Sequence, residues 1–237
     1  MSILSYSEEL FQTVKKAGQQ RKTELNRILV SSSNMKDVID ELDTDDKKKA
    51  CWINLYNSFS YLSLKENPEV LESKNSRSKH FTNRKFLIFD EMLSLDNIEH
   101  GILRRKKNKY SLGYLNSPFY PSFVYKLMVD YVDPRIHFAL NCGAKSCPLI
   151  RFYDWENIDE QLDEAAKSYI SQYFVHDKEQ NQITISKIFF WFRGDFGGKR
   201  GVLNFFKQYG FLDENAQPSI TYHKYDWRIY LQDFRND

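Results

Sequence analysis

Long hydrophobic runs are missing from the chain, and cysteine is scarce. No window approaches the roughly 18 to 20 consecutive apolar residues of a membrane-spanning helix, and acidic side chains occupy the place where a secretion signal has its apolar core. Three cysteines (Cys51, Cys142 and Cys147) in 237 residues are too few, and odd in number, for a disulfide framework. We therefore expect a cytoplasmic protein with reduced thiols and no membrane span.

An excess of charge of either sign is also missing. The 34 Lys and Arg residues nearly balance the 32 Asp and Glu residues, and the net charge is +2. This balance gives no electrostatic reason to expect nucleic acid or a membrane surface as the main partner. The expected partner is an unknown small molecule or peptide, and the oligomeric state stays open.

Several catalytic motifs do not occur. The chain has no HExxH, GxSxG or GxGxxG motif, so the sequence gives no support for a metalloprotease, a serine hydrolase or a dinucleotide-binding protein. The glycine-rich segment RGDFGGKRG at 193–201 precedes a helix and could hold an anion, but it lacks the order of a P-loop. A zinc site from Cys142, Cys147 and histidine fits no standard spacing. We expect neither a metal nor a cofactor.

Aromatic residues are abundant, and the pattern of elements is mixed. Eighteen Phe, 15 Tyr and 4 Trp predict a core filled with large rings. Apolar periodicity predicts an α+β fold, a helix-rich single domain around a small mixed or antiparallel sheet. Residues 1–45 are expected to form an N-terminal helical extension packed on a domain of residues 46–237.

The expected elements follow from apolar periodicity and from residues that cap or break helices. Helices are predicted over 3–29, from a cap at Ser33 or Asn34 to Leu42, and over 46–64, 94–106, 159–174 and 202–209. Strands are predicted over 85–89, 135–141, 182–186 and 221–231, and a long surface loop over 67–83.

Two asparagines stand inside the mainly apolar helix predicted at 46–64. Asn54 lies on a polar stripe with Cys51, opposite Trp52 and Tyr56, and Asn57 lies beside that stripe. Buried amides need specific partners. Asn54 is a candidate to orient a catalytic group or to bind substrate. For Asn57 we favour a tie to a neighbouring loop, and substrate binding is the alternative.

A carboxylate lies in the apolar face of the helix predicted at 94–106. Glu99 projects into the middle of an arc of leucines and isoleucines, where an unpaired charge would cost several kcal/mol. It should be paired or protonated, either as a structural anchor, which we slightly favour, or as a general acid or base with a raised pKa. His100 lies at the edge of the arc. Arg104 lies on the outer face, at a solvated helix end.

The segment RIHFALNCGAKSCP holds the strongest chemical signal. Strand alternation puts Cys142 on an apolar face, where a thiol is usually inert, while Cys147 lies in a loop whose N–H groups could lower its pKa. Cys147 is therefore the nucleophile candidate, with His100 or His137 as its base. His137 is awkward in that role, because an extended strand would place it roughly 15 Å from the loop.

The boxes CWINLYNSF, LSLDNIEHGILR, DPRIHFALNCGAKSCP, FRGDF and a terminal YDW resemble domain-of-unknown-function family 547 over residues 46–227. The resemblance implies no settled activity. Bacterial members usually carry both cysteines, as here, whereas plant members often have Ser or Asp at position 147. The position of Cys51 is usually Phe in the family. The family's boxes fall on Trp52, Asn54, Tyr56, Asn57, Glu99, His100, Arg104, His137, Cys142, Cys147, Pro148 and Asp195.

Two functions are consistent with this inventory. The first is a thiol-dependent hydrolase or acyltransferase in which Cys147 attacks, His100 or His137 acts as base, and Glu99 or Asn54 orients the imidazole. The second is a non-catalytic ligand- or protein-binding domain in which the same groups form a buried polar network. Further substrate-binding candidates, beside Asn57, are Arg104, Asn141 and Asp195.

Overall fold

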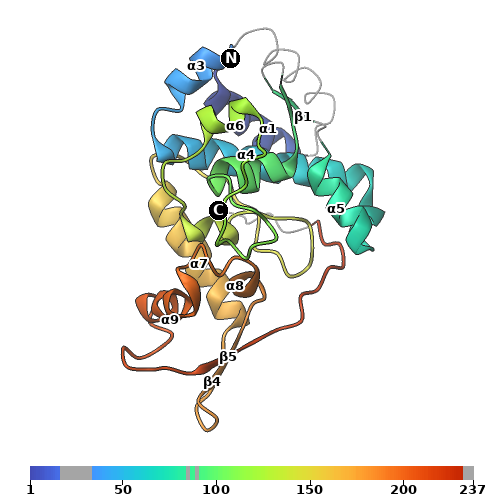
Figure 1. The fold of residues 1–237 in the computed structure, drawn as a ribbon. Helices are drawn as coiled ribbons and strands as arrows, with labels where there is room; N and C mark the ends of the chain where they lie inside the picture. Colours follow the sequence, from blue (N-terminus) through green and yellow to red (C-terminus); the bar gives the residue numbers. More distant parts are fainter. Residues whose placement is uncertain (17–33, 84–85, 89–90, 232–237) are drawn as a thin grey trace.

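A computed structural model describes residues 1–16, 34–83, 86–88 and 91–231, and it confirms a helix-rich α+β fold (Figure 1). The helices and helical turns of this part are α1 (Ile3–Lys15), α3 (Met35–Glu41), α4 (Asp45–Glu66), η1 (Pro68–Leu71), α5 (Lys74–Thr82), η2 (Asn97–Leu103), α6 (Ser122–Leu127), η3 (Pro134–Phe138), α7 (Ile158–Tyr173), α8 (Ile188–Trp191) and α9 (Gly198–Gln208). The strands are β1 (Phe86–Ile88), β2 (Glu91–Leu93), β3 (Val175–Asp177), β4 (Gln182–Ile185) and β5 (Ser219–Tyr222).

The two sheets are small and lie apart from the centre. Strands β1 and β2 form an antiparallel pair, and β3, β4 and β5 form a mixed sheet in which β4 pairs with β5 in parallel. Figure 1 shows α4 crossing the upper half of the molecule, with α1, α3 and α6 above it, while α7, α8, α9 and the mixed sheet form the lower half. The predicted small mixed and antiparallel sheets are therefore present, and helix α4 lies at the centre of the molecule.

Helix α4 is buried on every side along its middle. Thr44 caps its start by accepting the N–H of Lys47, and acidic residues occupy the first turn. From Lys49 to Ser60 every residue is buried, and the rings of Trp52 and Tyr56 are almost completely enclosed. A helix surrounded in this way organises the core on all of its faces.

The core has two parts, one in each half of the molecule. The upper cluster collects α1, α4, η2 and α6, and the lower cluster collects α7, α8, α9 and the mixed sheet, with Phe138 packed against Phe189 and Phe205. Residues of α1, including Tyr6 and Leu10, belong to the upper cluster. The division into an extension of residues 1–45 and a domain of residues 46–237 stays a prediction.

Several predicted elements agree with the structure. The helix at 46–64 corresponds to α4, the cap at Asn34 starts α3, and the predictions at 85–89, 159–174, 182–186 and 202–209 correspond to β1, α7, β4 and α9. The first predicted helix is present from Ile3 to Lys15, and its remaining part lies largely outside the described residues. The final predicted strand, 221–231, overlaps β5 only at its first two residues, and beyond Tyr222 the described chain forms only an isolated bridge at Ile229.

Two predicted elements are wrong. The polar stretch at 67–83 is not a loop, because Pro68 starts the turn η1 and Ser73 caps α5 by accepting the N–H of Ser76. The predicted strand at 135–141 is a helical turn, η3, over Pro134–Phe138. Proline at the first position of a helical turn has the fixed φ that such a turn needs, and Asp133 accepts the N–H of Arg135 to cap it.

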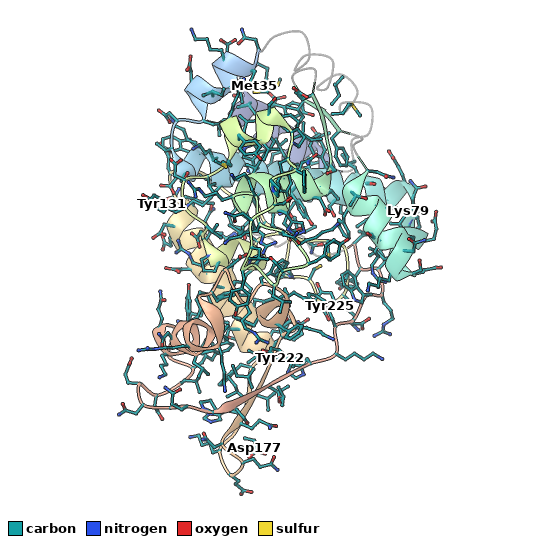
Figure 2. All side chains as sticks on the ribbon, viewed as in Figure 1. Met35, Lys79, Tyr131, Asp177, Tyr222 and Tyr225 are labelled. Carbon is teal, nitrogen blue, oxygen red and sulfur yellow. The ribbon has the colours of Figure 1, made fainter. Side chains whose placement is uncertain are left out.

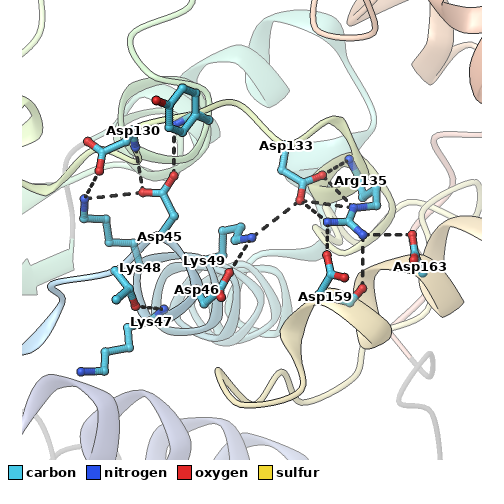
Figure 3. Close-up of polar contacts among 12 residues, drawn as sticks. Asp45, Asp46, Lys47, Lys48, Lys49, Asp130, Asp133, Arg135, Asp159 and Asp163 are labelled. Carbon is cyan, nitrogen blue, oxygen red and sulfur yellow. Dashed lines mark hydrogen bonds and ion pairs between the residues drawn. The ribbon is translucent and has the colours of Figure 1, made fainter.

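An ion-pair network holds this turn against the central helix (Figure 3). Asp133 binds Arg135 at 2.7 Å and lies 3.7 Å from Lys49 of α4. Arg135 reaches on to Asp159 at 2.6 Å and Asp163 at 2.9 Å, both on α7. The network therefore joins α4, η3 and α7, and it fixes the turn on which His137 lies.

Loss of the Asn57 amide should destabilise the fold. Its Nδ2 donates to the carbonyl of Ala139 at 2.9 Å and its Oδ1 accepts the N–H of Asn141 at 2.8 Å, all buried. Asn57→Ala leaves two buried backbone groups unpaired and should lower the free energy of unfolding by about 2–4 kcal/mol in urea titrations. Asn204→Ala, an exposed position on α9, is the control and should change it by less than about 0.5 kcal/mol. Equal effects of the two substitutions would contradict this account.

Candidate active site

A cavity of about 270 Å³ lies where the two core clusters meet. Four of the five predicted catalytic residues line it, namely Glu99, His100, His137 and Cys147. The other lining residues were not predicted as site residues; they are Tyr56, Phe81, Asp96, Lys109, Leu112, Leu140, Cys142, Ile188, Trp191, Phe192, Tyr225 and Trp227. Thiols, imidazoles and a carboxyl group thus share one small space.

The two cysteines of the cavity form a pair. The N–H of Cys142 donates to Sγ of Cys147 at 3.2 Å, and the Tyr225 hydroxyl lies 3.2 Å from Sγ of Cys147 and 3.7 Å from Sγ of Cys142. Cys147 is only 6% exposed, while Cys142 is less deeply buried. Within the described part of the chain, neither sulfur is hydrogen-bonded to a histidine.

The pKa shifts of the pair run opposite to expectation. A hydrogen bond from the Cys147 thiol, helped by the Ala144 N–H and the Tyr225 hydroxyl, lowers the pKa of Cys142 in spite of its burial. Burial, and the hydrogen bond and charge of Cys142, raise the pKa of Cys147 well above its usual value. These two directions differ from the expectation of an inert Cys142 and an activated Cys147. That expectation used the alternation of an extended strand, whereas residues 134–138 form the helical turn η3.

Tyr225 reaches the sulfurs because the chain near its end pairs with the cysteine loop. Lys145 N–H donates to Arg228, Tyr230 N–H donates to Gly143, and Ala144 faces Ile229 in an antiparallel bridge. Figure 2 shows Tyr225 beside the central loops, far from Asp177 at the tip of the β3–β4 hairpin. The terminal YDW box is the sequence signal for this contact.

His137 has a buried carboxylate partner. Its Nε2–H donates to Oδ2 of Asp195 at 2.8 Å, and its ring stacks on Phe192 at 3.8 Å. Burial lowers the pKa of His137, with Asp195 opposing and Arg104 adding to this effect, so the ring is neutral near pH 7. Its Nδ1 has no hydrogen bond within the described residues, so it is the nitrogen left to accept a proton.

Arg104 is completely buried, although the sequence predicts it on the outer face of a solvated helix end. The reason is that η2 is wound as a π-helix, with Arg104 N–H donating to the carbonyl of Glu99 at 2.9 Å. In an α-helix, residues five apart lie about 140° from each other, whereas this bond stacks Arg104 one turn after the inward-facing Glu99.

The guanidinium of Arg104 binds His100 directly and is linked to His137 through Asp195. It donates to Asp195 at 2.6 Å from Nε and 3.2 Å from Nη2, and to Nδ1 of His100 at 2.8 Å. Because Nδ1 of His100 accepts this bond, the ring carries its proton on Nε2, which lies 3.8 Å from Asp96. Burial and the Arg104 charge keep the pKa of His100 well below its usual value. His100 is therefore poorly disposed to take a proton from a thiol.

The segment 193–201 supplies Asp195. Gly194 N–H donates to Leu112 at 2.7 Å, and a Cβ on Gly194 would come within 2.5 Å of the Gly113 backbone. Glycine is required for this close approach, which carries Asp195 inward. The carboxyl is fully buried, and the hydrogen bonds and charges of His137 and Arg104 outweigh the effect of burial and lower its pKa. The sequence suggests that this segment could hold an anion; in the structure the segment itself contributes the Asp195 carboxylate.

Glu99 is both paired and protonatable. The hydroxyl of Tyr56 donates to its Oε2 at 3.0 Å. Burial raises its pKa from 4.5 to about 7, with Arg104 opposing. A carboxyl group that is about half protonated at neutral pH can donate or accept a proton in the cavity.

Five of the predicted site residues do not line the cavity: Asn54, Asn57, Arg104, Asn141 and Asp195. Asn54 binds both backbone groups of Tyr153, at 2.8 and 3.0 Å. Asn141 donates to Pro148 and accepts from Gly143, each at 2.6 Å, and so closes the cysteine loop. In the structure the three asparagines position backbone, while Arg104 and Asp195 position the histidines.

Comparisons with known proteins give a family without an activity. A family model described as "Protein of unknown function, DUF547" matches residues 39–170, more than half of the 237 residues. No curated protein and no solved structure matches the chain. Within the described residues, no group of three or more His, Cys, Asp and Glu is placed to hold a metal ion.

The raised pKa of Glu99 makes stability depend on pH. The folded state holds this proton more tightly than the unfolded state, so the contribution is complete below pH 4.5 and is lost as pH rises through about 7. Glu99→Gln, which resembles the protonated acid, should match the native chain at pH 5 and exceed its unfolding free energy by up to about 3 kcal/mol at pH 8. Glu179→Gln, a control in an exposed turn, should differ from the native chain in unfolding free energy by the same amount at both pH values. A Glu99→Gln difference that does not change with pH would contradict the assignment.

Proposed function

Since the chain belongs to the DUF547 family, whose description names no activity, we propose its function from the cavity: a thiol-dependent hydrolase or acyltransferase. The observation that carries the proposal is the convergence on one cavity of two paired thiols, an imidazole held by a buried carboxylate, and a carboxyl group with a pKa of about 7. Nucleophilic acyl transfer uses a nucleophile, a base that activates it and an acid that protonates the leaving group, and these groups can supply all three.

Cys142 is the attacking residue in this proposal. Its pKa is lowered, and the residue as a whole is less deeply buried than Cys147. A thiolate attacks and a thiol does not, so the cysteine that holds the shared negative charge is the nucleophile. Cys147, which the sequence analysis favoured, then acts as the hydrogen-bond donor that stabilises the Cys142 thiolate.

His137 is the base and Asp195 orients it. Asp195 fixes the ring with Nε2 protonated, which leaves Nδ1 to accept a proton from a thiol or from water. This division of roles matches that of a carboxylate–imidazole pair beside a nucleophile. His100 is not assigned the base role, because Arg104 occupies its Nδ1.

The chemical step balances with these groups. The Cys142 thiolate forms a bond to the acyl carbon, the bond to the leaving group breaks, and that group takes a proton from the Glu99 carboxyl. Water, or an acceptor alcohol or amine, then attacks the thioester while Nδ1 of His137 takes its proton. The sulfur leaves as a thiolate, and the proton returns to Glu99.

The cavity favours a small acyl group. Its volume lies just below the lower end of the range of about 300–1,000 Å³ that is typical of pockets for drug-sized ligands. The walls of Trp191, Phe192 and Trp227 are apolar and aromatic. A short acyl chain, or the acyl end of a small molecule or peptide, fits such a space. Reduced thiols suit the cytoplasm, which we propose as the compartment.

A non-catalytic binding domain is the second candidate. The observation that favours it is the fully buried Arg104 guanidinium, which donates to Asp195 and His100 and thereby joins the polar side chains behind the cavity. Polar networks of this kind specify a core even where no reaction occurs. In that case ligands would occupy the cavity without acylating either thiol.

Trapping of an acyl-enzyme separates the two candidates. Incubation with p-nitrophenyl acetate or p-nitrophenyl butyrate, followed by intact-mass and peptide mass spectrometry, should place one acyl group per chain on Cys142. Cys142→Ser should lose this acylation, and His137→Ala should slow it by about 10²- to 10⁴-fold. Cys51→Ser is the matched control and should be acylated as the native chain is, because Cys51 is buried beside Ile3, away from the cavity.

The other outcomes are also decisive. Acylation that survives Cys142→Ser but not Cys147→Ser would show that Cys147 is the nucleophile, and the proposed hydrolase or acyltransferase reaction would stand. Chains that remain folded and are never acylated, but that protect the cavity thiols when a ligand binds, would favour the binding domain. Near-UV circular dichroism of each variant checks that the fold is retained.

A further inference from the structure

One surface segment has an unusual composition. From Arg105 to Val129 the chain contains no Asp or Glu, and it carries five cations: Arg105, Lys106, Lys107, Lys109 and Lys126. The same 25 residues contain six Phe and Tyr residues. The whole chain has a net charge of only +2, so this basic and aromatic segment is a local feature.

The segment folds back on itself as a hairpin-like loop that packs on α6. Lys107 bridges Asn116, Asn108 N–H donates to Leu115 at 2.9 Å, and Ser117 N–H donates to Lys106 at 2.7 Å. These contacts hold the two arms together. The cations of the first arm and the apolar residues of the second arm therefore lie on neighbouring stretches of backbone.

Helix α6 joins the same surface. The hydroxyl of Tyr125 donates to the carbonyl of Pro118 at 2.9 Å, and Nζ of Lys106 lies 4.6 Å from the centre of the Tyr125 ring. We call this surface the 105–126 face. It consists of Arg105, Lys106, Lys107, Tyr110, Tyr114, Leu115, Pro118, Phe119, Tyr125 and Lys126.

Large apolar side chains protrude from the 105–126 face. Phe119 is 89% exposed, Tyr110 79% and Leu115 66%. Single exposed apolar residues are ordinary, but three large ones within ten residues of one folded-back loop indicate an interaction site. Hydrophobic burial in the monomer does not explain these residues.

The cations of the face have no carboxylate partners. Arg105, Lys106, Lys107 and Lys126 form no ion pair with any residue that the structure describes, whereas Lys109 is paired with Asp96. Four cations thus lie on the same segment of chain as the exposed rings, and the described residues hold no carboxylate that pairs with them. A partner that supplies both negative charge and an apolar layer would satisfy both kinds of side chain.

We propose that the 105–126 face docks on an anionic membrane surface. Lipid headgroups supply the negative charge, and the boundary between headgroups and acyl chains accepts the side chains of Phe119, Leu115 and Tyr110. Arg105, Lys107 and Lys126 remain at the level of the headgroups. Nucleic acid suits the face less well, because Leu115, which is 66% exposed, does not stack on bases as an aromatic ring does.

Docking in this way would bring the cavity close to the lipid. Lys109 and Leu112, at the turn of the same loop, line the cavity. The face and the cavity mouth thus share one segment of chain. This inference does not depend on the thiol chemistry, since the face would bind lipid whether or not the cavity is catalytic.

Vesicle co-sedimentation of the full chain tests the proposal. The probes are vesicles of phosphatidylcholine alone and vesicles of equal parts phosphatidylcholine and phosphatidylserine. Binding should be much stronger to the anionic vesicles and should weaken as salt is raised. Leu115→Ser together with Phe119→Ser should lower the partition coefficient by about tenfold or more, because each apolar side chain contributes to insertion.

Two matched variants control for general effects of surface substitution. Tyr131→Ser removes a ring that is 82% exposed beside the acidic Asp130 and Asp45, and it should leave vesicle binding unchanged. Arg105→Glu with Lys126→Glu should lower anionic binding by about tenfold or more. Lys65→Glu with Lys178→Glu carries the same charge change at exposed positions elsewhere, and it should lower binding by a much smaller factor.

The remaining outcomes overturn the proposal. These are a folded native chain that binds neither vesicle type, or equal loss of binding in the face variants and their controls. Tighter binding to a single-stranded oligonucleotide than to anionic vesicles, lost in the same face variants, would assign the face to nucleic acid instead.

Discussion

The buried ion pair of Arg104 and Asp195 is the interaction on which the site depends. A guanidinium and a carboxylate, both fully removed from water, are stable together only when nearly all of their hydrogen-bonding groups are used. Here Arg104 also donates to His100, and Asp195 also accepts from His137. The pair joins the π-wound turn η2 to the glycine-rich segment that carries Asp195. Fold and site geometry therefore rest on the same contact, and loss of either partner would leave an uncompensated buried charge.

The polar residues around this pair fall into two groups: amides that bind backbone groups, and titratable side chains that line the cavity. The side-chain nitrogen and oxygen of Asn57 and of Asn141 are hydrogen-bonded to backbone groups, and these bonds position the loop that carries the two cysteines. The groups on the cavity wall include titratable side chains with shifted pKa values: the pKa of Cys142 is lowered, and those of Cys147 and Glu99 are raised. Rigid amide contacts behind a small cavity are what a preorganised reactive site requires.

Sequence reasoning found much of the inventory but little of its arrangement. Glu99 was recognisable, because a carboxyl in an apolar arc must be paired or protonated, and it accepts the Tyr56 hydroxyl while burial raises its pKa to about 7. Arg104 was placed wrongly, because a π-turn changes which residues share a face and leaves no periodic trace in seven residues. Residues 135–141 alternate like a strand, but Pro134 and the Asp133 cap favour a helical turn. The contact of Tyr225 with the sulfurs joins positions some 80 residues apart, which no local pattern encodes.

The central claim is that two neighbouring thiols share one negative charge and that Cys142 holds it. A pH-dependent alkylation profile of the native protein with iodoacetamide, read at each cysteine by mass spectrometry, tests this most directly. The account predicts that Cys142 reacts fastest, with an apparent pKa below the roughly 8.5 of a free thiol, while Cys147 reacts slowly and Cys51 reacts only after unfolding. Should Cys142 titrate no lower than an ordinary thiol, or should Cys147 react first, the assignment of the charge to Cys142 would be contradicted.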